Sequence, residues 1–370
     1  MSDAGTAALD GSQQIDSAEI DDRDKARRAI AIWLWASAGM VFAMAIIGAI
    51  TRLTESGLSM TEWRPLIGAI PPLNEAEWQR VFDLYRATPE YQFKNAGMGL
   101  DQFKLIFFWE WFHRLWGRLI GVVYALPFFW FLFRRQIPLG FHGRLWILLV
   151  LGGLQGVIGM FMVMSGLVDR PSVSHYRLAL HLGMATFIFA MLVVTAIQIV
   201  RPAGQSLSTA SRGLITHGWL GLAMVSVTIV WGAFVAGLDA GLFYNTFPLM
   251  NGAWLPSELF DVRPLWFGLV DNPALVQFTH RYLAIATAIV LAAFSLRAWR
   301  QTALPMPIRV LGAGVGGMAL FQTLLGIATL LSQVWIPLAA VHQAGALILL
   351  ALLTAFMWSV RGEAKSAATA

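Results

Sequence analysis

The sequence predicts an all-α integral membrane protein whose eight transmembrane helices form two pseudo-symmetric four-helix bundles. Three observations support this fold class. Hydrophobic residues make up 57% of the chain and charged residues only 13%, and the mean hydropathy is +0.64. Apolar segments of about 20 residues, each long enough to cross a hydrocarbon core of about 30 Å, recur along the chain. Several motifs also repeat at one fixed offset, which indicates an internal duplication.

The predicted spans are separated by short polar connections and a few longer ones. The second span is long and ends in Arg134 and Arg135, so we expect it to be tilted or to begin in the membrane interface. The spans are expected at residues 29–51, 105–133, 145–165, 178–200, 213–236, 275–297, 310–331 and 338–360.

The first 28 residues are polar and rich in acids, and we expect residues 1–28 to be a disordered cytoplasmic tail. They have neither the apolar stretch of a signal peptide nor the basic composition of a mitochondrial transit peptide. An even number of spans places both termini on one side, and lysine and arginine gather in the loops of that side. The positive-inside rule therefore predicts cytoplasmic termini in a bacterial inner membrane.

Charge and cysteine content exclude several classes of function. The net charge of +5 follows from the loop bias that sets membrane orientation, and the sequence has no motif for binding nucleic acid. The chain contains no cysteine. Disulfides, thiolate metal ligands, iron–sulfur clusters and covalently attached c-type haem are therefore excluded.

Internal repeats divide the chain into two halves. "QGVIGMFM" (155–162) lies 167 residues before "QTLLGIAT" (322–329), and the same offset carries "EWFHR" (110–114) onto "QFTHR" (277–281). Because each half crosses the membrane an even number of times, the repeats have parallel topology and are related by an axis along the membrane normal.

The predicted halves are joined by a polar segment. The N-terminal four-helix half covers residues 29–200, the linker "RPAGQSLSTASR" covers residues 201–212, and the C-terminal half covers residues 213–370. We expect each half to hold its own binding site, because the histidine motifs are duplicated together with the helices.

Four histidines lie near the outer ends of the even-numbered predicted spans, at similar depth: His113, His181, His280 and His342. A single buried histidine is more often a hydrogen-bonded structural residue than a ligand. Two depth-matched pairs in duplicated halves favour bis-histidine coordination of a haem iron in each half. Zinc would need a third or fourth ligand near each pair, and the sequence offers no such cluster.

An arginine directly follows the first histidine of each pair. Arg114 can form an ion pair with Glu110 one helical turn earlier, which is the simplest explanation of its presence. Arg281 recurs, however, where the residue matching Glu110 is the neutral Gln277. Haem propionates near the outer surface are therefore the favoured common partner of Arg114 and Arg281.

Glu110 marks a difference between the halves. It lies one helical turn before His113 and on the same face, whereas Gln277 holds the equivalent place before His280. An ionisable group beside only one site suggests one reactive haem and one that relays electrons. The alternative is a glutamate at the membrane boundary that is paired with Arg114.

Five stretches of the chain resemble the signature segments of the haem A synthase family. They are "TRLTESGLSMTEWRPLIGAIPPL" (51–73), "EWFHRLWGR" (110–118), "MVMSGLVDRPSVSHYRLALHL" (162–182), "FTHR" (278–281) and "VHQ" (341–343). The resemblance covers essentially everything after the polar tail. The lack of cysteine is similar to the cysteine-free alphaproteobacterial and mitochondrial-like branch, so no role of a cysteine pair is carried over.

The resemblance implies an activity and a role for each candidate residue. Haem O, the substrate, or haem A, the product, would lie between His113 and His181, and haem b would lie between His280 and His342. The family oxidises a methyl group of haem O to a formyl group, giving haem A for terminal oxidases. Its catalytic glutamate corresponds to Glu110. The resemblance also implies that haem O arrives from a farnesylating haem O synthase, and it identifies no electron donor or acceptor.

Two other functional classes remain open on the sequence alone. A di-haem b-type cytochrome for quinol-linked electron transfer would use the same four histidines, but it has no need for the difference between Glu110 and Gln277. A transporter, for haem or another substrate, would bind its cargo near the bilayer midplane between the halves. The polar residues instead gather in the outer leaflet within each half, which disfavours a transporter.

Overall fold

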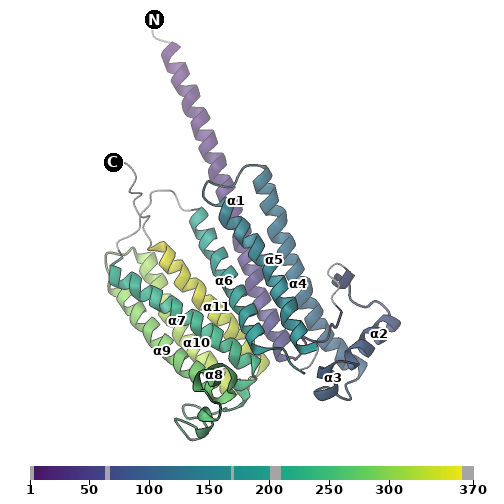
Figure 1. Cartoon of the computed structure of the whole chain (residues 1–370). Coiled ribbons are helices and arrows are strands. Elements are labelled where there is room, and N and C mark those ends of the chain that lie inside the picture. Colours follow the sequence, from purple (N-terminus) through teal and green to yellow (C-terminus); the bar gives the residue numbers. More distant parts are fainter. Residues whose placement is uncertain (1–3, 63–66, 168–170, 201–209, 361–370) are drawn as a thin grey trace.

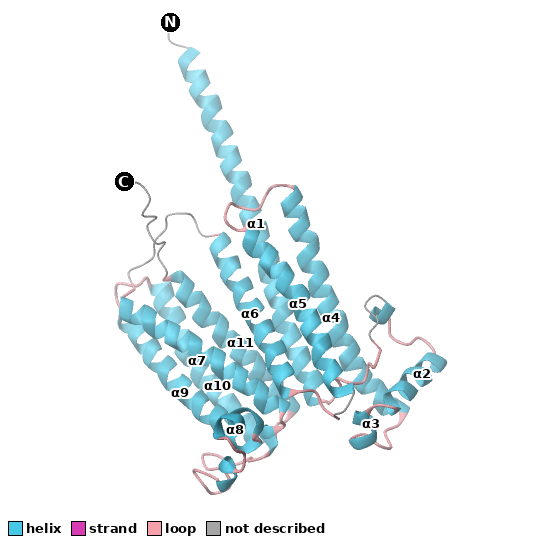
Figure 2. Ribbon diagram, viewed as in Figure 1, coloured by secondary structure: helices cyan, strands magenta, loops and turns pink. Residues whose placement is uncertain are grey.

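The computed structural model describes residues 4–62, 67–167, 171–200 and 210–360. Within these ranges every regular secondary-structure element is a helix (Figure 2). Eight helices are long and apolar enough to cross a membrane, which confirms the predicted number and order of spans. They are α1 (Ala4–Leu53), α4 (Leu100–Phe133), α5 (His142–Leu167), α6 (His175–Ile199), α7 (Arg212–Gly237), α9 (Pro273–Arg300), α10 (Met306–Leu331) and α11 (Ile336–Ser359).

Helix α1 is longer than the span expected at its position. The helix begins at Ala4, and an apolar stretch long enough to cross a membrane lies within Asp21–Leu53. The structure therefore differs from the predicted disordered tail over residues 1–28, because this segment is helical from Ala4 onward. The segment contains no proline, and Lys25 pairs with Asp21 one turn earlier at 2.6 Å, a spacing that supports an exposed helix.

The first four spans pack around one another in a closed ring (Figure 1). Helix α4 packs between α1 and α5, and α6 packs between α5 and α1. Helices α4 and α6 consequently lie diagonally opposite across the ring, which is the arrangement that lets a ligand sit between side chains from two facing helices.

The last four spans repeat this order of neighbours. Helix α9 packs between α7 and α10, and α11 packs between α10 and α7, so α9 and α11 are the diagonal pair. The symmetry axis that the repeats predict between the two groups stays a prediction.

The two groups of helices share an apolar interface. Helix α6 packs on α7 and α11, and α1 packs on α11. One continuous core cluster runs through both groups. A side-chain bond crosses the same interface, because the Gln343 amide donates to the carbonyl of Ala45 at 2.6 Å. Most of the predicted linker, residues 201–209, lies outside the described residues.

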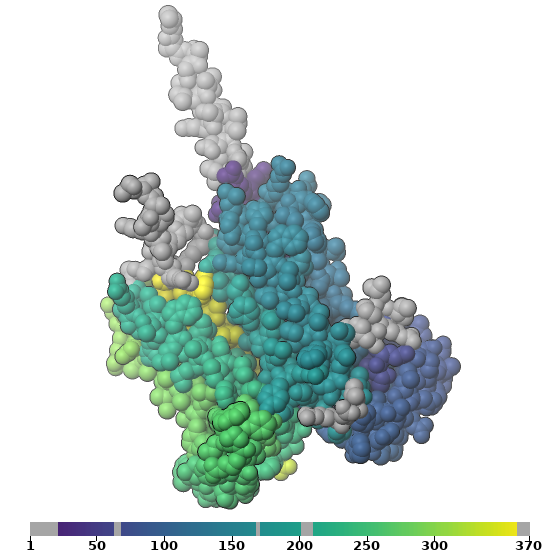
Figure 3. Space-filling view, viewed as in Figure 1, coloured from purple at the N-terminus to yellow at the C-terminus, as the bar shows by residue number. Residues whose placement is uncertain are grey.

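The short helices that connect the spans lie at one end of the helical body. The start of α1 and the end of α11 lie at one end, and the short helices α2 (Glu75–Arg86), α3 (Pro89–Phe93) and α8 (Leu265–Asp271) lie at the opposite end (Figures 1 and 3). The histidine motifs lie toward the end with the short helices, which we call the outer end.

The first outer segment is a small folded unit on α4. After the 3₁₀ turn Ile67–Ala69, the Asn74 side chain caps α2 by accepting from the backbone N–H of Glu77 at 2.9 Å. Helix α4 begins at Leu100, earlier than predicted, because its first turns carry apolar side chains that pack on α2 rather than on lipid. The buried aromatic residues of this contact are Phe82, Tyr85, Phe103 and Phe107.

The second outer segment lies over the C-terminal group. It contains the 3₁₀ turns Ala240–Leu242 and Ser257–Phe260, followed by α8. Asn272 joins it to α9: its side-chain oxygen accepts from the backbone N–H of Ala274, and its amide donates to the carbonyl of Glu258 at 2.8 Å. The buried residues of this segment are Tyr244, Met250, Leu259 and Ala274.

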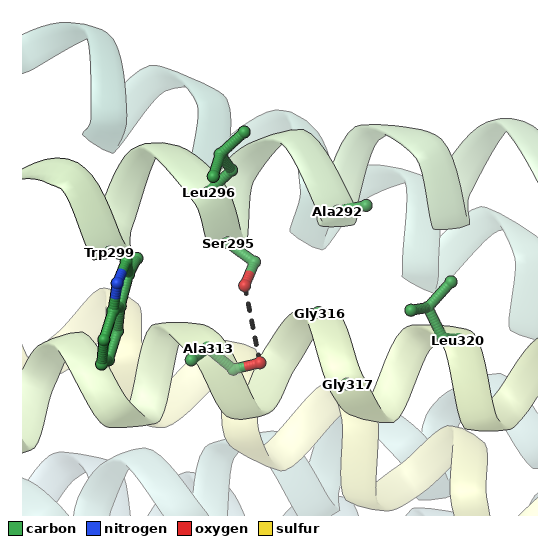
Figure 4. Close-up of a pocket in the computed structure, with 8 residues that line it drawn as sticks. All are labelled: Ala292, Ser295, Leu296, Trp299, Ala313, Gly316, Gly317 and Leu320. Atoms are coloured by element: carbon green, nitrogen blue, oxygen red, sulfur yellow. Dashed lines mark hydrogen bonds between the residues drawn. The ribbon is translucent and has the colours of Figure 1, made fainter.

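Helices α9 and α10 pack closely against each other at a place distant from the histidines (Figure 4). A Cβ atom added at Gly316 would lie 2.5 Å from Cβ of Ser295, and the Ser295 hydroxyl donates to the carbonyl of Ala313 at 3.5 Å. This contact explains Gly316 as a packing residue, since small residues let helix backbones approach in a membrane. The shallow groove beside it is lined by apolar side chains.

The charge bias of the loops predicts which end faces the cytoplasm. A reporter fused after Ala370 should read as cytoplasmic, and one inserted after the exposed Gly97 should read as periplasmic, because arginine and lysine are retained on the inner side. Paired enzymatic reporters for the two compartments measure this directly. Reversed signals would place the histidines in the inner leaflet and contradict the predicted orientation.

Candidate functional site

The structure brings the four predicted histidines together in two pairs. His113 of α4 and His181 of α6 face each other across the first ring and are close enough to interact electrostatically. His280 of α9 and His342 of α11 do the same in the second ring. All four side chains extend from diagonal helices near the outer end of the body, as axial ligands of a haem in a helical bundle do.

Each histidine ring lies against a glycine of the neighbouring odd-numbered span. A Cβ atom at any of these glycines would come within 3.3 Å of the imidazole Cε1, so a larger residue would displace the ring. The four contacts are Gly48 with His113, Gly159 with His181, Gly232 with His280 and Gly326 with His342. Gly159 of the third span therefore lies beside a histidine.

A glutamine holds one histidine of each pair. The Gln155 amide donates to the backbone carbonyl of His181 at 3.0 Å and lies 3.1 Å from its Nδ1. The Gln322 amide donates to the carbonyl of His342 at 2.7 Å and lies 3.1 Å from its Nδ1. Both glutamines are one turn before a glycine that contacts the same ring. The duplicated "QxxxG" pattern was visible in the sequence, and it is the signal that could have identified them.

The other histidine of each pair has a buried nitrogen without a hydrogen bond. Within the described residues, Nδ1 of His113 and Nδ1 of His280 have no partner. A buried polar atom without a partner costs about 1–3 kcal/mol. Binding to a haem iron would give such a buried imidazole a partner. The residues present therefore fit a bis-histidine haem in each ring. Within the described ranges no group of three or more metal-binding side chains occurs, which leaves each pair as a two-ligand site.

Glu110 lies at the centre of a hydrogen-bond network at the outer end of α4. It is only 3% exposed. Its Oε2 accepts from the Ser59 hydroxyl and from the backbone N–H of Met60, both at 2.7 Å. Its Oε1 accepts from Arg114 at 2.5 Å. The ion pair considered as an alternative on sequence grounds is therefore present, and the loop that follows α1 completes the coordination of the carboxylate.

Gln277 occupies the matching place in the second half, but it donates hydrogen bonds to its loop where Glu110 accepts them. It is 2% exposed, and its amide donates to the carbonyls of Ala240 and Tyr244 at 2.7 and 3.1 Å. Glu110 accepts bonds from its loop, whereas Gln277 donates bonds to its loop. The two residues thus tie equivalent loops to equivalent helices, and only Glu110 adds a charge beside a histidine pair.

The two predicted propionate-binding arginines also hold these loops. Arg114 donates to the carbonyl of Met60 at 3.0 Å, and Arg281 donates to the carbonyls of Tyr244 and Thr246, the latter at 2.8 Å. Their pairing with haem propionates stays a prediction. A guanidinium carries five N–H donors, so each side chain can hold a loop and bind an anion at once.

His175 is the buried first residue of α6. Its Nε2 lies 2.9 Å from a carboxylate oxygen of Asp271 at the end of α8, and the Tyr176 hydroxyl donates to the same carboxylate at 2.6 Å. This contact links the two groups of helices at their outer end. Sequence reasoning missed it because the partners are separated by almost a hundred residues.

Fold and site together define a polytopic helical membrane protein with two facing histidine pairs and one buried carboxylate. The chain matches the COX15-CtaA family, described as cytochrome oxidase assembly protein, over residues 31–354. The chain therefore belongs to this family.

Similar proteins match nearly the whole chain. A protein from Rhodospirillum centenum named Heme A synthase is 56% identical over 328 residues, covering 89% of this chain and 87% of that protein. One of the same name from Parvibaculum lavamentivorans is 45% identical, covering 94% and 97% of the two chains. Another from Caulobacter vibrioides is 43% identical, covering 92% and 98%.

The glycine contacts predict a selective effect of a single methyl group. Gly326→Ala should displace the ring of His342, because the new Cβ would lie 2.9 Å from its Cε1. We expect haem affinity in the second ring to fall on the order of tenfold, as for other residues that support a metal ligand. Haem per purified protein, measured from the pyridine haemochrome spectrum, reports the loss.

Gly314→Ala on the same helix is the matched control, since an added Cβ there meets nothing within 4 Å. It should keep its haem and stabilise α10 by up to about 1 kcal/mol. Equal haem contents in the two variants would contradict the role of Gly326.

Proposed function

We propose that this chain is a haem A synthase of a bacterial inner membrane, with both termini in the cytoplasm. It oxidises a methyl group of haem O to the formyl group of haem A. The relatives that match almost the whole chain carry this name. The observation that carries the proposal is the buried carboxylate of Glu110, which lies one turn from His113 and has a neutral counterpart in the second half.

We assign haem O to the first ring and haem b to the second. His113 and His181 would hold the substrate, and His280 and His342 would hold the cofactor. The support for this order is the charge of Glu110: a group that handles protons belongs beside the haem that reacts. Gln277 offers no such group to the second ring, and an electron relay needs none.

The residues of the first ring can do three things for this reaction. His113 and His181 would hold the substrate between α4 and α6. The carboxylate of Glu110 can accept protons as C–H bonds of the methyl group are lost. Arg114, Ser59 and the backbone of Met60 hold that carboxylate in place by donating to its two oxygens. When bound, haem b supplies one-electron transfer.

Proton handling follows from the balance of the reaction. With water as the formal oxygen source, a methyl group and one water give a formyl group, four protons and four electrons. The electrons need a redox partner, and the protons need a route to water. We expect haem O itself to come from a farnesylating haem O synthase, since the substrate is a farnesylated haem.

A di-haem b-type cytochrome is the second candidate, and one observation favours it. Glu110 and Gln277 both tie an outer loop to a helix, so the ion pair of Glu110 with Arg114 has a structural use without catalysis. The two candidates differ in pigment: the synthase holds haem b together with haem O or haem A, and the cytochrome holds haem b at both sites.

Glu110→Gln separates the two functions. A glutamine keeps the size of the side chain but cannot hold a negative charge or accept a proton as a carboxylate does. We expect the variant to insert and bind haem while haem A per molecule falls by roughly 10²-fold or more, with haem O or a partly oxidised form accumulating. Pigment extraction and chromatography, normalised to purified protein, measure this.

Ser59→Ala is the matched control, because it removes a bond to the same carboxylate but keeps the charge. Haem A per molecule should stay within a few-fold of the unmodified protein, although yield falls. Normal haem A per molecule in Glu110→Gln would remove Glu110 from catalysis.

The two haem sites should be separable. His280→Ala or His342→Ala should deplete haem b and leave farnesylated haem in the first ring, because the ligand pairs lie in different rings. His217→Ala, which removes a histidine bonded to the carbonyl of Val290 at 2.9 Å, should keep both pigments. If the His280 and His342 variants lose only haem O or haem A, the assignment of the halves is reversed.

A further inference from the structure

We propose that Glu90, a buried carboxyl group in the first outer segment, is a second proton-handling residue that passes protons from Glu110 to the outer aqueous phase. The inference rests on the proposed function, since Glu110 must first receive those protons. Glu90 lies in α3, outside the membrane spans, and contacts no histidine of either pair.

Glu90 is buried in an unusual way for a glutamate. It is 3% exposed although it belongs to a five-residue helix at the outer end of the molecule. Its Oε2 accepts from the hydroxyl of the fully buried Tyr85 at 3.1 Å, and that hydroxyl accepts from the amide of Asn95 at 2.7 Å. Among the described residues no cation forms an ion pair with its carboxylate, because Lys94 pairs with Glu55 at 2.8 Å. A buried acid that lacks a cationic partner is costly to keep charged.

The loop after α1 brings Glu90 and Glu110 into one electrostatic unit. Ser59 and Met60 of this loop hold the carboxylate of Glu110. Glu55 of the same loop holds Lys94, the residue that caps α3. One short loop therefore contacts both elements, and the charge of Glu110 is near enough to raise the pKa of Glu90.

The loop after α1 also carries hydroxyl groups close to Glu110. Ser59 donates to Glu110, and the hydroxyls of Thr54 and Ser56 lie 2.6 Å apart. Ser56 and Ser59 are both almost completely buried. Hydroxyl groups both donate and accept, so the Glu110 carboxylate has a polar environment on the side of this loop whether or not it carries a proton.

The surroundings of Glu90 make it titrate near neutral pH. Burial raises the pKa of Glu90 to about 8; the hydrogen bond from Tyr85 opposes this rise, the charges of Glu110 and Glu55 add to it, and Lys94 weakly opposes it. A proton carrier works best when its pKa lies near the working pH.

The charge state of Glu110 controls whether Glu90 keeps or releases its proton. With Glu110 charged, repulsion keeps a proton on Glu90. When Glu110 takes a proton from the reaction, that repulsion ends, the pKa of Glu90 falls, and Glu90 releases its proton to the outer water. The O–H bond of Glu110 then breaks as an O–H bond forms at Glu90, which restores the first state. One proton leaves in each cycle and no electron moves.

A structural role would need only the hydrogen bond between Glu90 and Tyr85. Glu90→Gln keeps an acceptor for the Tyr85 hydroxyl and removes the titration, so it separates the two roles. Glu77→Gln is the matched control, because Glu77 is an exposed acid of the same outer segment that pairs with Arg80 at 3.1 Å.

The first readout is independent of turnover. Infrared difference spectra of the purified, haem-containing full chain should show a protonated carboxyl band that titrates with a midpoint near 8. The band should be absent in Glu90→Gln, unchanged in Glu77→Gln, and shifted to a lower midpoint in Glu110→Gln, where the repelling charge is gone. A band that survives in Glu90→Gln, or that does not shift in Glu110→Gln, overturns the proposal.

The second readout is the pH dependence of haem O oxidation. The rate of the unmodified protein should rise with pH, because release of the Glu90 proton becomes easier. The midpoint of this rise should lie below the infrared midpoint, since release occurs while Glu110 is protonated and no longer repels the charge on Glu90. Glu90→Gln should lose this rise and slow on the order of tenfold at neutral pH, less than the roughly 10²–10⁴-fold of a direct acid–base group. Its haem content should stay that of Glu77→Gln.

The outcomes distinguish this inference from the proposed function. If the unmodified protein oxidises haem O and Glu90→Gln has the same rate and pH profile, the relay is wrong and the function stands. If a slower Glu90→Gln also loses haem in proportion, its role is structural and the relay is again wrong. If the unmodified protein forms no haem A from haem O, the proposed function itself fails.

Discussion

A polar side chain inside a membrane must find its partner within the protein, and this constraint organises the outer end of both rings. A charged residue at the centre of a membrane helix costs about 2.5–3.5 kcal/mol on insertion scales. Glu110 and Arg114 meet this constraint together with the loop after α1, and Gln277 and Arg281 meet it with the carbonyls of the second outer segment. The loops are thus held by the same helix positions that precede and follow the histidines.

The constraint also explains why glycine and glutamine accompany the histidines. An imidazole that points into a ring of helices needs room beside it, and Gly159 and Gly326 provide room that any Cβ atom would fill. It also needs a fixed orientation, which Gln155 and Gln322 give by bonding to the backbone carbonyl of the histidine they touch. One imidazole of each pair is thus held by both a glycine contact and a glutamine, which favours preorganised metal coordination.

Much of this architecture was predictable from sequence because it depends on local patterns. Hydropathy predicted the eight spans, which the structure confirms. Spacing within each half predicted the similar depth of the histidines, and their role as ligand pairs stays a prediction. Long-range contacts were not predictable. Nothing local to His175 indicates Asp271, and nothing local to Glu110 indicates Ser59. The tail from Ala4 also differs, since a polar composition typical of disorder does not exclude helix where proline is absent.

The opposite hydrogen-bond polarity of Glu110 and Gln277 is the strongest physical difference between the two halves. A loop held by an accepting carboxylate must present donors, and the loop after α1 does so with a hydroxyl and a backbone N–H. A loop held by a donating amide must present carbonyls, and the second outer segment does so at Ala240 and Tyr244. Each loop therefore bonds best to its own side chain. A glutamine at position 110 could still accept from the loop through its single oxygen, but it would not carry the charge beside His113. The halves thus differ both in the side chain before the histidine and in the loop that binds it. This difference agrees with the proposal that one site reacts and the other transfers electrons.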